Sequence, residues 1–173
     1  GTSGALQRTT TFKLTVKELN FSLSHGGDKS TEQAIPVTNV ITAKLLSGNM
    51  APVSFSYSVD DPSAGITASF SPSASCTPNQ PPDSRCSITM TITPSGTTPP
   101  KPDYKITVKG KIGSVERATT FNLEVTPAPP FDFSLSATNN PLSVTQGGAV
   151  NNTITVKREA GIPASVLLSY SVD

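Results

Sequence analysis

The chain has 173 residues, which at roughly 100 to 200 residues per domain is enough for one or two domains with cores of their own. One His, no Trp, two Cys and 12 acidic residues leave few groups for an acid-base or metal site, so we expect no enzymatic activity and no cofactor. A formal net charge of +1 gives no reason to expect a nucleic acid as partner, and no apolar run approaches the roughly 18 residues of a membrane span.

The sequence repeats itself at offsets of about 110 residues. An offset of 109 carries Phe12 onto Phe121, and an offset of 113 carries Tyr57 onto Tyr170. On this interpretation the chain begins and ends inside domains, and we expect it to be a segment of a longer protein. The predicted domains are residues 1–17 as the C-terminal part of a first repeat, 18–127 as a complete repeat, and 130–173 as the N-terminal part of a third.

The complete repeat shows the alternation of β-strands and no helical period. In residues 53–59, Val53, Phe55 and Tyr57 share one phase and serines occupy the other, which places the apolar side chains on one face of a pleated strand. The same pattern recurs along the repeat between Gly, Pro, Asn and Asp turns. The strands expected in chain order are 20–24, 37–45, 53–59, 66–70, 88–92, 104–108 and 121–125.

About seven short alternating strands in one repeat predict an all-β fold of tandem immunoglobulin-like β-sandwich domains, each with two antiparallel sheets. Tyr104 adds to this prediction, because it stands two residues before the inward Ile106 at the start of the penultimate strand, where a tyrosine corner would be expected.

A spacer follows the complete repeat. Residues 126–130 read Thr-Pro-Ala-Pro-Pro, which is typical of a semi-rigid polyproline-type connection. We therefore expect neighbouring domains to be held at a fairly fixed distance.

The motifs of the complete repeat resemble those of a known family. They are Phe-Ser-Leu-Ser at 21–24, Gly-Ile-Thr-Ala-Ser-Phe-Ser-Pro at 65–72, Tyr-Lys-Ile-Thr-Val at 104–108, and the closing strand 117–125. Together they look like the tandem Ig-like repeats of large archaeal and bacterial cell-surface and secreted proteins. The resemblance implies a stalk, spacer or filament module and supplies no catalytic motif. The chain departs from that pattern in its Cys-containing insertion and in residues 98–103.

Cys76 and Cys86 flank a loop with three prolines and no apolar anchor, and we predict that they form a disulfide. Closing a loop of about 11 residues would destabilise the unfolded chain by roughly 2.5 to 3 kcal/mol. The alternative is a pair of reduced thiols in a cytosolic protein. Zinc would require further Cys or His residues nearby, and the sequence has none there.

The remaining polar motifs suggest turns rather than sites. His25 and Asp28 are neighbours in a turn, whereas hydrolase triads are assembled from distant segments, so we predict no catalytic role for them. Asp60, Asp61 and Asp173 end equivalent strands but lack the dense oxygen cluster that calcium needs.

Two sets of side chains bear on possible ligands. The inward phase of all three tyrosines argues against a surface on which sugars stack; they are Tyr57, Tyr104 and Tyr170. Four lysines of one strand region could form a basic stripe, but without interleaved aromatics a solvated face is the better interpretation. These lysines are Lys101, Lys105, Lys109 and Lys111.

Asn20 and Asn151 each open an N-glycosylation pattern, so glycans belong to the expected partners. Asn151 has an outward phase, and Asn20 lies at a domain junction. Asn39 and Asn152, which the repeat matches, have inward phases and should need hydrogen-bond partners.

The sequence favours a non-enzymatic structural segment of an extracellular or cell-surface protein: a stalk, an adhesin shaft or a filament subunit. Its partners would be neighbouring Ig-like repeats of the same chain and other copies that complete its sheets by strand addition. The alternative is a carbohydrate- or protein-binding Ig-like module that uses the Cys76–Cys86 loop or the strand edges, with a role as accessory to a secreted hydrolase also open.

Overall fold

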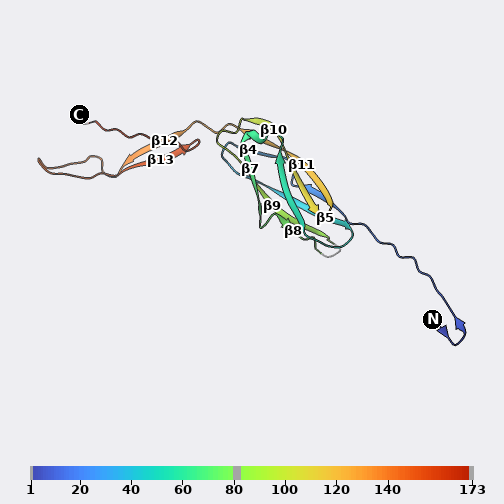
Figure 1. The fold of residues 1–173 in the computed structure, drawn as a ribbon. Helices are drawn as coiled ribbons and strands as arrows, with labels where there is room; N and C mark the ends of the chain where they lie inside the picture. The colour runs from blue at the N-terminus through green and yellow to red at the C-terminus, as the bar shows by residue number, and fades with distance from the viewer. Residues whose placement is uncertain (1, 80–82, 172–173) are drawn as a thin grey trace.

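The computed structural model describes residues 2–79 and 83–171, and among these residues it contains no α-helix. Its body is formed by residues 20–126, as Figure 1 shows. A thin segment leads from this body to the N-terminus, and a hairpin extends from its opposite end, so the described chain is elongated. The prediction of an all-β protein is confirmed.

The first sheet of the body has four strands in the order β3-β5-β9-β7. Each strand is antiparallel to its neighbours. The strands are β3 (Asn20–His25), β5 (Val37–Ser47), β9 (Arg85–Pro94) and β7 (Ile66–Ser71).

The second sheet has five strands in the order β4-β11-β10-β6-β8. β4 lies parallel to β11, and the other pairs are antiparallel. The strands are β4 (Lys29–Glu32), β11 (Val115–Thr126), β10 (Lys101–Ile112), β6 (Val53–Val59) and β8 (Ser75–Cys76). A short 3-10 helix, η1 (Pro62–Ala64), lies between β6 and β7.

The two sheets bury one common core, which makes the body a β-sandwich. The first sheet contributes Phe21 and Met90, the second Ile106 and Leu123, and these side chains are at most 1% exposed. The alternation predicted these phases, because apolar residues at every second position of a strand point to the same face. All fully buried core residues lie between Phe21 and Val125, so the sandwich closes its core without the flanking segments.

The sandwich has more strands than expected. About seven were predicted for residues 18–127, and the described residues of that region form nine. The additional strands are β4 and β8, both short and at sheet edges. Each is held by main-chain pairing to one neighbour and carries no alternating apolar residues. Hydrophobic periodicity therefore could not reveal these two strands.

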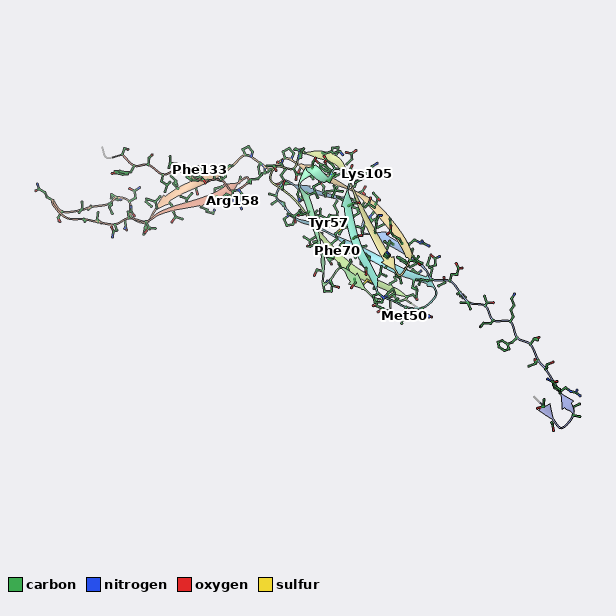
Figure 2. All side chains as sticks on the ribbon, in the orientation of Figure 1. Met50, Tyr57, Phe70, Lys105, Phe133 and Arg158 are labelled. Carbon is green, nitrogen blue, oxygen red and sulfur yellow. A yellow bond between two sulfur atoms is a disulfide. The ribbon has the colours of Figure 1, made fainter. Side chains whose placement is uncertain are left out.

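The flanking segments form two hairpins outside the sandwich. Near the N-terminus β1 (Thr2–Ser3) pairs with β2 (Leu6–Gln7), and after the sandwich β12 (Asp132–Ala137) pairs with β13 (Ile154–Ala160). Figure 2 shows the side chains of Phe133 and Arg158 on the second hairpin, away from the body.

The inward phases predicted for this last part of the chain are wrong in the structure. Tyr170 is 93% exposed and Asn152 is exposed as well. The physical reason is that, within the described residues, β12 and β13 have no facing sheet and Tyr170 lies in a segment that forms no strand.

Candidate functional site

A disulfide joins Cys76 of β8 to Cys86 of β9. The two strands belong to different sheets, so the bond ties the sheets together near one end of the sandwich. It also closes the loop between them, of which residues 80–82 lie outside the described residues. Both half-cystines pack against the core, and the crosslink therefore anchors a loop that would otherwise be held by little apolar contact.

His25 and Asp28 have structural partners and do not contact each other through any hydrogen bond found in the structure. The Nδ1 atom of His25 accepts a hydrogen bond from the Gly27 N–H at 3.1 Å, and its ring centroid lies 5.4 Å from that of Phe121. The Asp28 carboxylate accepts the Asn122 N–H at 2.8 Å, which joins the β3–β4 turn to β11. These groups stabilise a turn.

Asp60 and Asp61 organise the end of β6. The Oδ1 atom of Asp60 accepts the Lys105 N–H at 3.1 Å. Asp61 caps η1, since its Oδ1 accepts the N–H of Ser63 at 3.0 Å and the Ser63 hydroxyl at 2.6 Å. The hydroxyl bond, with help from the N–H bond, holds the pKa of Asp61 below its usual value. Asp173, the third aspartate of the predicted set, lies outside the described residues.

Lys101 and Tyr104 lie beside these aspartates. The Lys101 ammonium is 3.5 Å from Asp60 and 3.6 Å from Asp103, and it stands 4.8 Å from the centre of the Tyr104 ring. Burial would lower the pKa of Lys101, but the charges of the two aspartates outweigh it and raise that pKa. Within the described residues no group of three or more His, Cys, Asp or Glu side chains could hold a metal ion.

The Tyr104 hydroxyl donates a hydrogen bond to the Pro99 carbonyl at 2.8 Å. The ring is 1% exposed, and burial, followed by the negative charge of Asp61, raises the pKa of the hydroxyl. A buried tyrosine bonded to the main chain five residues upstream is the arrangement of a tyrosine corner.

The other lysines of β10 line its exposed face. Lys109 pairs with Glu116 of β11 at 3.1 Å, and both side chains are half exposed. Surface pairs of this kind contribute little to stability. The stripe therefore carries both signs of charge where β10 meets β11.

The two glycosylation acceptors differ in their surroundings. The Oδ1 atom of Asn20 accepts a hydrogen bond from the Arg117 guanidinium at 2.9 Å, and the residue is half buried where β3 begins. Asn151 is exposed just before β13. The structure thus presents Asn151 more openly than Asn20.

Asn39 is 1% exposed in β5, and both ends of its amide are satisfied. Oδ1 accepts the Gly26 N–H at 2.9 Å, and Nδ2 donates to the Gly27 carbonyl at 3.0 Å. Asn152 makes a similar pair of bonds, but both to one residue: Oδ1 accepts the Asn139 N–H at 3.0 Å and Nδ2 donates to the Asn139 carbonyl at 2.8 Å. The prediction that both amides need partners is met, although Asn152 is exposed.

Sequence reasoning assigned no role to Gln33, which follows β4. Its Nε2 donates to the Thr98 carbonyl at 2.6 Å, and its Oε1 accepts the Ala128 N–H at 3.1 Å. One side chain thus joins a loop of the sandwich to the segment that leaves it. The sequence signal for Gln33 is the repeat, which places a glutamine, Gln146, at the corresponding position of the next repeat.

The tyrosines show how far the inward phases hold within the sandwich. Tyr57 is half buried, its hydroxyl accepts the Ala68 N–H at 2.8 Å, and its ring lies 6.2 Å from that of Phe70 (Figure 2). Neither Tyr57 nor Tyr104 offers an open ring face. None of the helices that the structure describes is long and apolar enough to cross a membrane.

Fold and side chains define an all-β sandwich protein whose polar groups serve turns, caps and strand ends. No protein-family model matches the chain, and no curated protein matches it. Among solved structures it is similar to domains 4 and 5 of the S-layer protein SbsC, with 18% identity and a TM-score of 0.38 over 62% of this chain and 53% of that one. It is also similar to domains 4–9 of SbsC, with 17% identity and a TM-score of 0.40 over 83% of this chain and 20% of that one.

A third similar structure is a family 123 glycoside hydrolase from Clostridium perfringens, with 14% identity and a TM-score of 0.42 over 63% of this chain and 27% of that one. The chain therefore spans about half the length of the first of these structures and smaller parts of the other two. Likeness at this level assigns neither a family nor a function.

Proposed function

We propose that the chain is a non-enzymatic structural segment of an extracellular or cell-surface protein, built as a row of Ig-like sandwich domains. The observation that carries the proposal is that strand registers of the sandwich recur in both flanking segments. A row of domains is what a stalk, shaft or filament requires.

The hairpin β12–β13 repeats the register of β3–β5. Phe21 pairs with Leu45, and the residues that correspond at offsets of 112 and 113, Phe133 and Arg158, pair in the same way. The remaining pairs of the two ladders correspond one by one, and both ladders have an irregularity after their first pair. Two segments that share register and bulge are best explained as the same two strands of successive domains.

The N-terminal hairpin repeats the tip of β10–β11. Thr2 pairs with Gln7 and Lys111 with Glu116, 109 positions further on. The glycines at the two turns, Gly4 and Gly113, have nearly equal φ angles of 58° and 57°, a left-handed conformation that glycine adopts without strain. We infer that residues 2–17 are the last hairpin tip and strand of a preceding domain.

A pair of glycines supports the same correspondence. At Gly48 an added Cβ would lie 2.7 Å from the Cα of Leu19, and at Gly161 it would lie 2.5 Å from the Cα of Phe131. In both places the chain entering a domain crosses directly over a glycine with positive φ. The close approach of two main chains explains why glycine stands at both positions.

The Ig-like topology is supported by strand order. In chain order β3, β5, β7 and β9 take the places of strands A, B, D and E, and their sheet order is A-B-E-D. β6, β10 and β11 take the places of C, F and G in the facing sheet. The Tyr104 bond to Pro99 then falls at the corner before strand F.

The disulfide supports a location outside the cytoplasm, because such bonds persist in oxidising compartments and are rare in the cytosol. The test of location is protease treatment of intact cells of the source organism, followed by mass spectrometry. Release of peptides from this chain, with Cys76 joined to Cys86, would support the proposal. Peptides that appear only after lysis, with free thiols, would contradict it.

The test of architecture is a protein made of two and then three consecutive copies of residues 18–131. Small-angle scattering should show a maximum dimension that grows by about one domain length with each copy, and circular dichroism should show β-structure without helix. A compact particle would contradict the row. A glycan array probed with residues 18–127 distinguishes the alternative function, since specific sugar binding would make the segment a recognition module.

A further inference from the structure

We propose that successive domains of the row meet in a built interface: one end of the sandwich, formed by Gln33, Gly96 and Thr98 and here named the exit pole, receives both the linker and the Gly161–Pro163 loop of the next domain. This inference rests on the proposed function, because it assigns residues 130–171 to a following domain. Its occupant is the next domain of the same chain.

The linker is held to the exit pole by the side chain of Gln33. Its amide bonds to the Thr98 carbonyl on one side and to the Ala128 N–H on the other, while its own N–H donates to the Thr126 carbonyl at 3.0 Å. Thr98 is fully buried, so the amide is anchored to a fixed part of the sandwich. A linker residue bonded in this way has a defined direction as it leaves β11.

The next domain touches the exit pole through one loop. All residues from 151 to 159 are exposed, but Ala160, Gly161 and Ile162 are half buried. The side chain of Ile162 lies over Gly96, where an added Cβ would come within 3.1 Å of its Cδ1. Glycine at position 96 therefore leaves the room that an apolar side chain from the next domain occupies.

The linker and the loop belong to one arrangement. Gly161 lies against the main chain of Pro130 and Phe131, the last linker residues, and its carbonyl accepts a hydrogen bond from the Arg158 guanidinium at 3.0 Å. A cleft of about 520 Å³ beside this contact is lined from both sides, by residues 32–35 of the sandwich and by residues 158–163 of the next domain. The direction of the linker thus determines where Ile162 meets Gly96.

The same interface predicts which residues at the opposite end of the sandwich contact the preceding domain. At an offset of 113, Gly161 and Ile162 correspond to Gly48 and Asn49, and the Met50 side chain next to them is 38% exposed in the described chain (Figure 2). We place residues 48–50 against the exit pole of the preceding domain. Because Asn49 stands where the next domain has Ile162, the apolar contact at this face would come from Met50, whose unbranched side chain suits an adaptable contact.

Amide exchange of the chain in its present length tests the linker contact. The Ala128 N–H should exchange about tenfold or more slowly than in an unstructured peptide, and Gln33→Ala should remove that protection while the core amides of β10 keep theirs. Gln146→Ala is the matched control, because it makes the same change at the corresponding position of the next domain and should leave Ala128 unchanged. Exchange of Ala128 at the unstructured rate in the unaltered chain would overturn the interface.

Residual dipolar couplings test the docking of the loop. In the unaltered chain the N–H vectors of Phe131, Gly161 and Ile162 should fit the alignment tensor of the sandwich. Ile162→Ser, which lies outside the sandwich core, should end that agreement, whereas Leu142→Ser in the same segment should preserve it. If the N–H vectors of the unaltered chain do not fit the alignment tensor of the sandwich, the built interface is wrong. If tandem copies of residues 18–131 are nevertheless elongated, the proposed row of domains still holds.

Discussion

The strand pair β3–β5 and the hairpin β12–β13 have the same register but very different burial. Phe21 is 1% exposed and Phe133 is 38% exposed; Ile41 is fully buried and Ile154 is 48% exposed. What differs is the second sheet, which covers β3–β5, whereas the described part of the chain places no facing sheet over β12–β13. Strand pairing and register are therefore encoded locally, by alternation and turn residues, whereas burial requires strands that are distant in sequence.

The largest expected effect sharpens this comparison with two matched phenylalanines. Phe121 is 2% exposed in β11, and its counterpart Phe12 is 87% exposed in the N-terminal segment. Phe121→Ala should lower the free energy of unfolding by about 3 to 5 kcal/mol, because it removes a buried ring and leaves a cavity. Phe12→Ala should change it by less than about 0.5 kcal/mol. Chemical denaturation of the chain measures both, and equal losses would show that the N-terminal segment is part of the same core.

The disulfide is next in size and has no counterpart in the described hairpin. Replacing both Cys76 and Cys86 by Ser should lower the free energy of unfolding by roughly 2.5 to 3 kcal/mol on the loop-entropy account, since the bond closes a sequence separation of 10 residues. Urea unfolding with and without reductant measures the loss in the unaltered chain, and the double variant should be insensitive to the reductant. A variant as stable as the oxidised parent would mean that the loop needs no crosslink.

Asn39 and Asn152 test whether β3–β5 and β12–β13 really differ in burial. Asn39 and Asn152 each bond through their amide to the main chain of the preceding strand end or turn, but Asn39 is 1% exposed and Asn152 is open to water. Asn39→Ala should cost about 1 to 2 kcal/mol, because it removes two hydrogen bonds of a buried amide, although the Gly26 N–H keeps its bond to the Val40 carbonyl. Asn152→Ala should cost little, since water replaces the amide. Thermal unfolding compares them, and a large loss at Asn152 would show that the hairpin is buried in solution.

The smallest effect concerns the hydroxyl of Tyr104. Tyr104→Phe keeps the ring in the core but removes the hydrogen bond to the Pro99 carbonyl, so it should cost about 1 kcal/mol. Because burial raises the pKa of this hydroxyl, the folded protein should also resist its ionisation. Ultraviolet titration should show one fewer high-pH tyrosine in the variant. Loss of a tyrosine that titrates in the ordinary range, with the high-pH step kept, would place Tyr104 in water.

The alternation of apolar residues predicted most of the sandwich, because it depends on the pleat of each strand alone. Phe121, Leu123 and Val125 are buried in β11 as their phase requires. β4 and β8 were missed, since a short edge strand is fixed by main-chain bonds to a partner and needs no apolar pattern. Tyr170 was also predicted to point inward from its place in the alternation. The alternation predicts the side of a strand on which a residue lies, but not whether another sheet covers that side.

The polar residues show a similar division. The pairing of Cys76 with Cys86 follows from two cysteines around one loop, and the need of Asn39 for partners follows from its phase. The repeat marks Gln33 by matching it with Gln146, but its partners could not be predicted, because Thr98 and Ala128 are 65 and 95 residues away in sequence. Contacts of that kind depend on the closed fold.

In the proposed row of domains, the two linkers differ in length by three residues. At the offset of 109, the end of β11 at Thr126 corresponds to Lys17, which leaves residues 18 and 19 as the earlier linker, whereas five residues, 127–131, lie between β11 and β12. The prolines of the longer linker favour the polyproline II helix, which has three residues per turn and a rise of about 3.1 Å per residue. An insertion of three residues then adds one full turn and about 9 Å of length. On the proposed architecture, successive domains would move apart along the axis while each keeps the same face toward its surroundings.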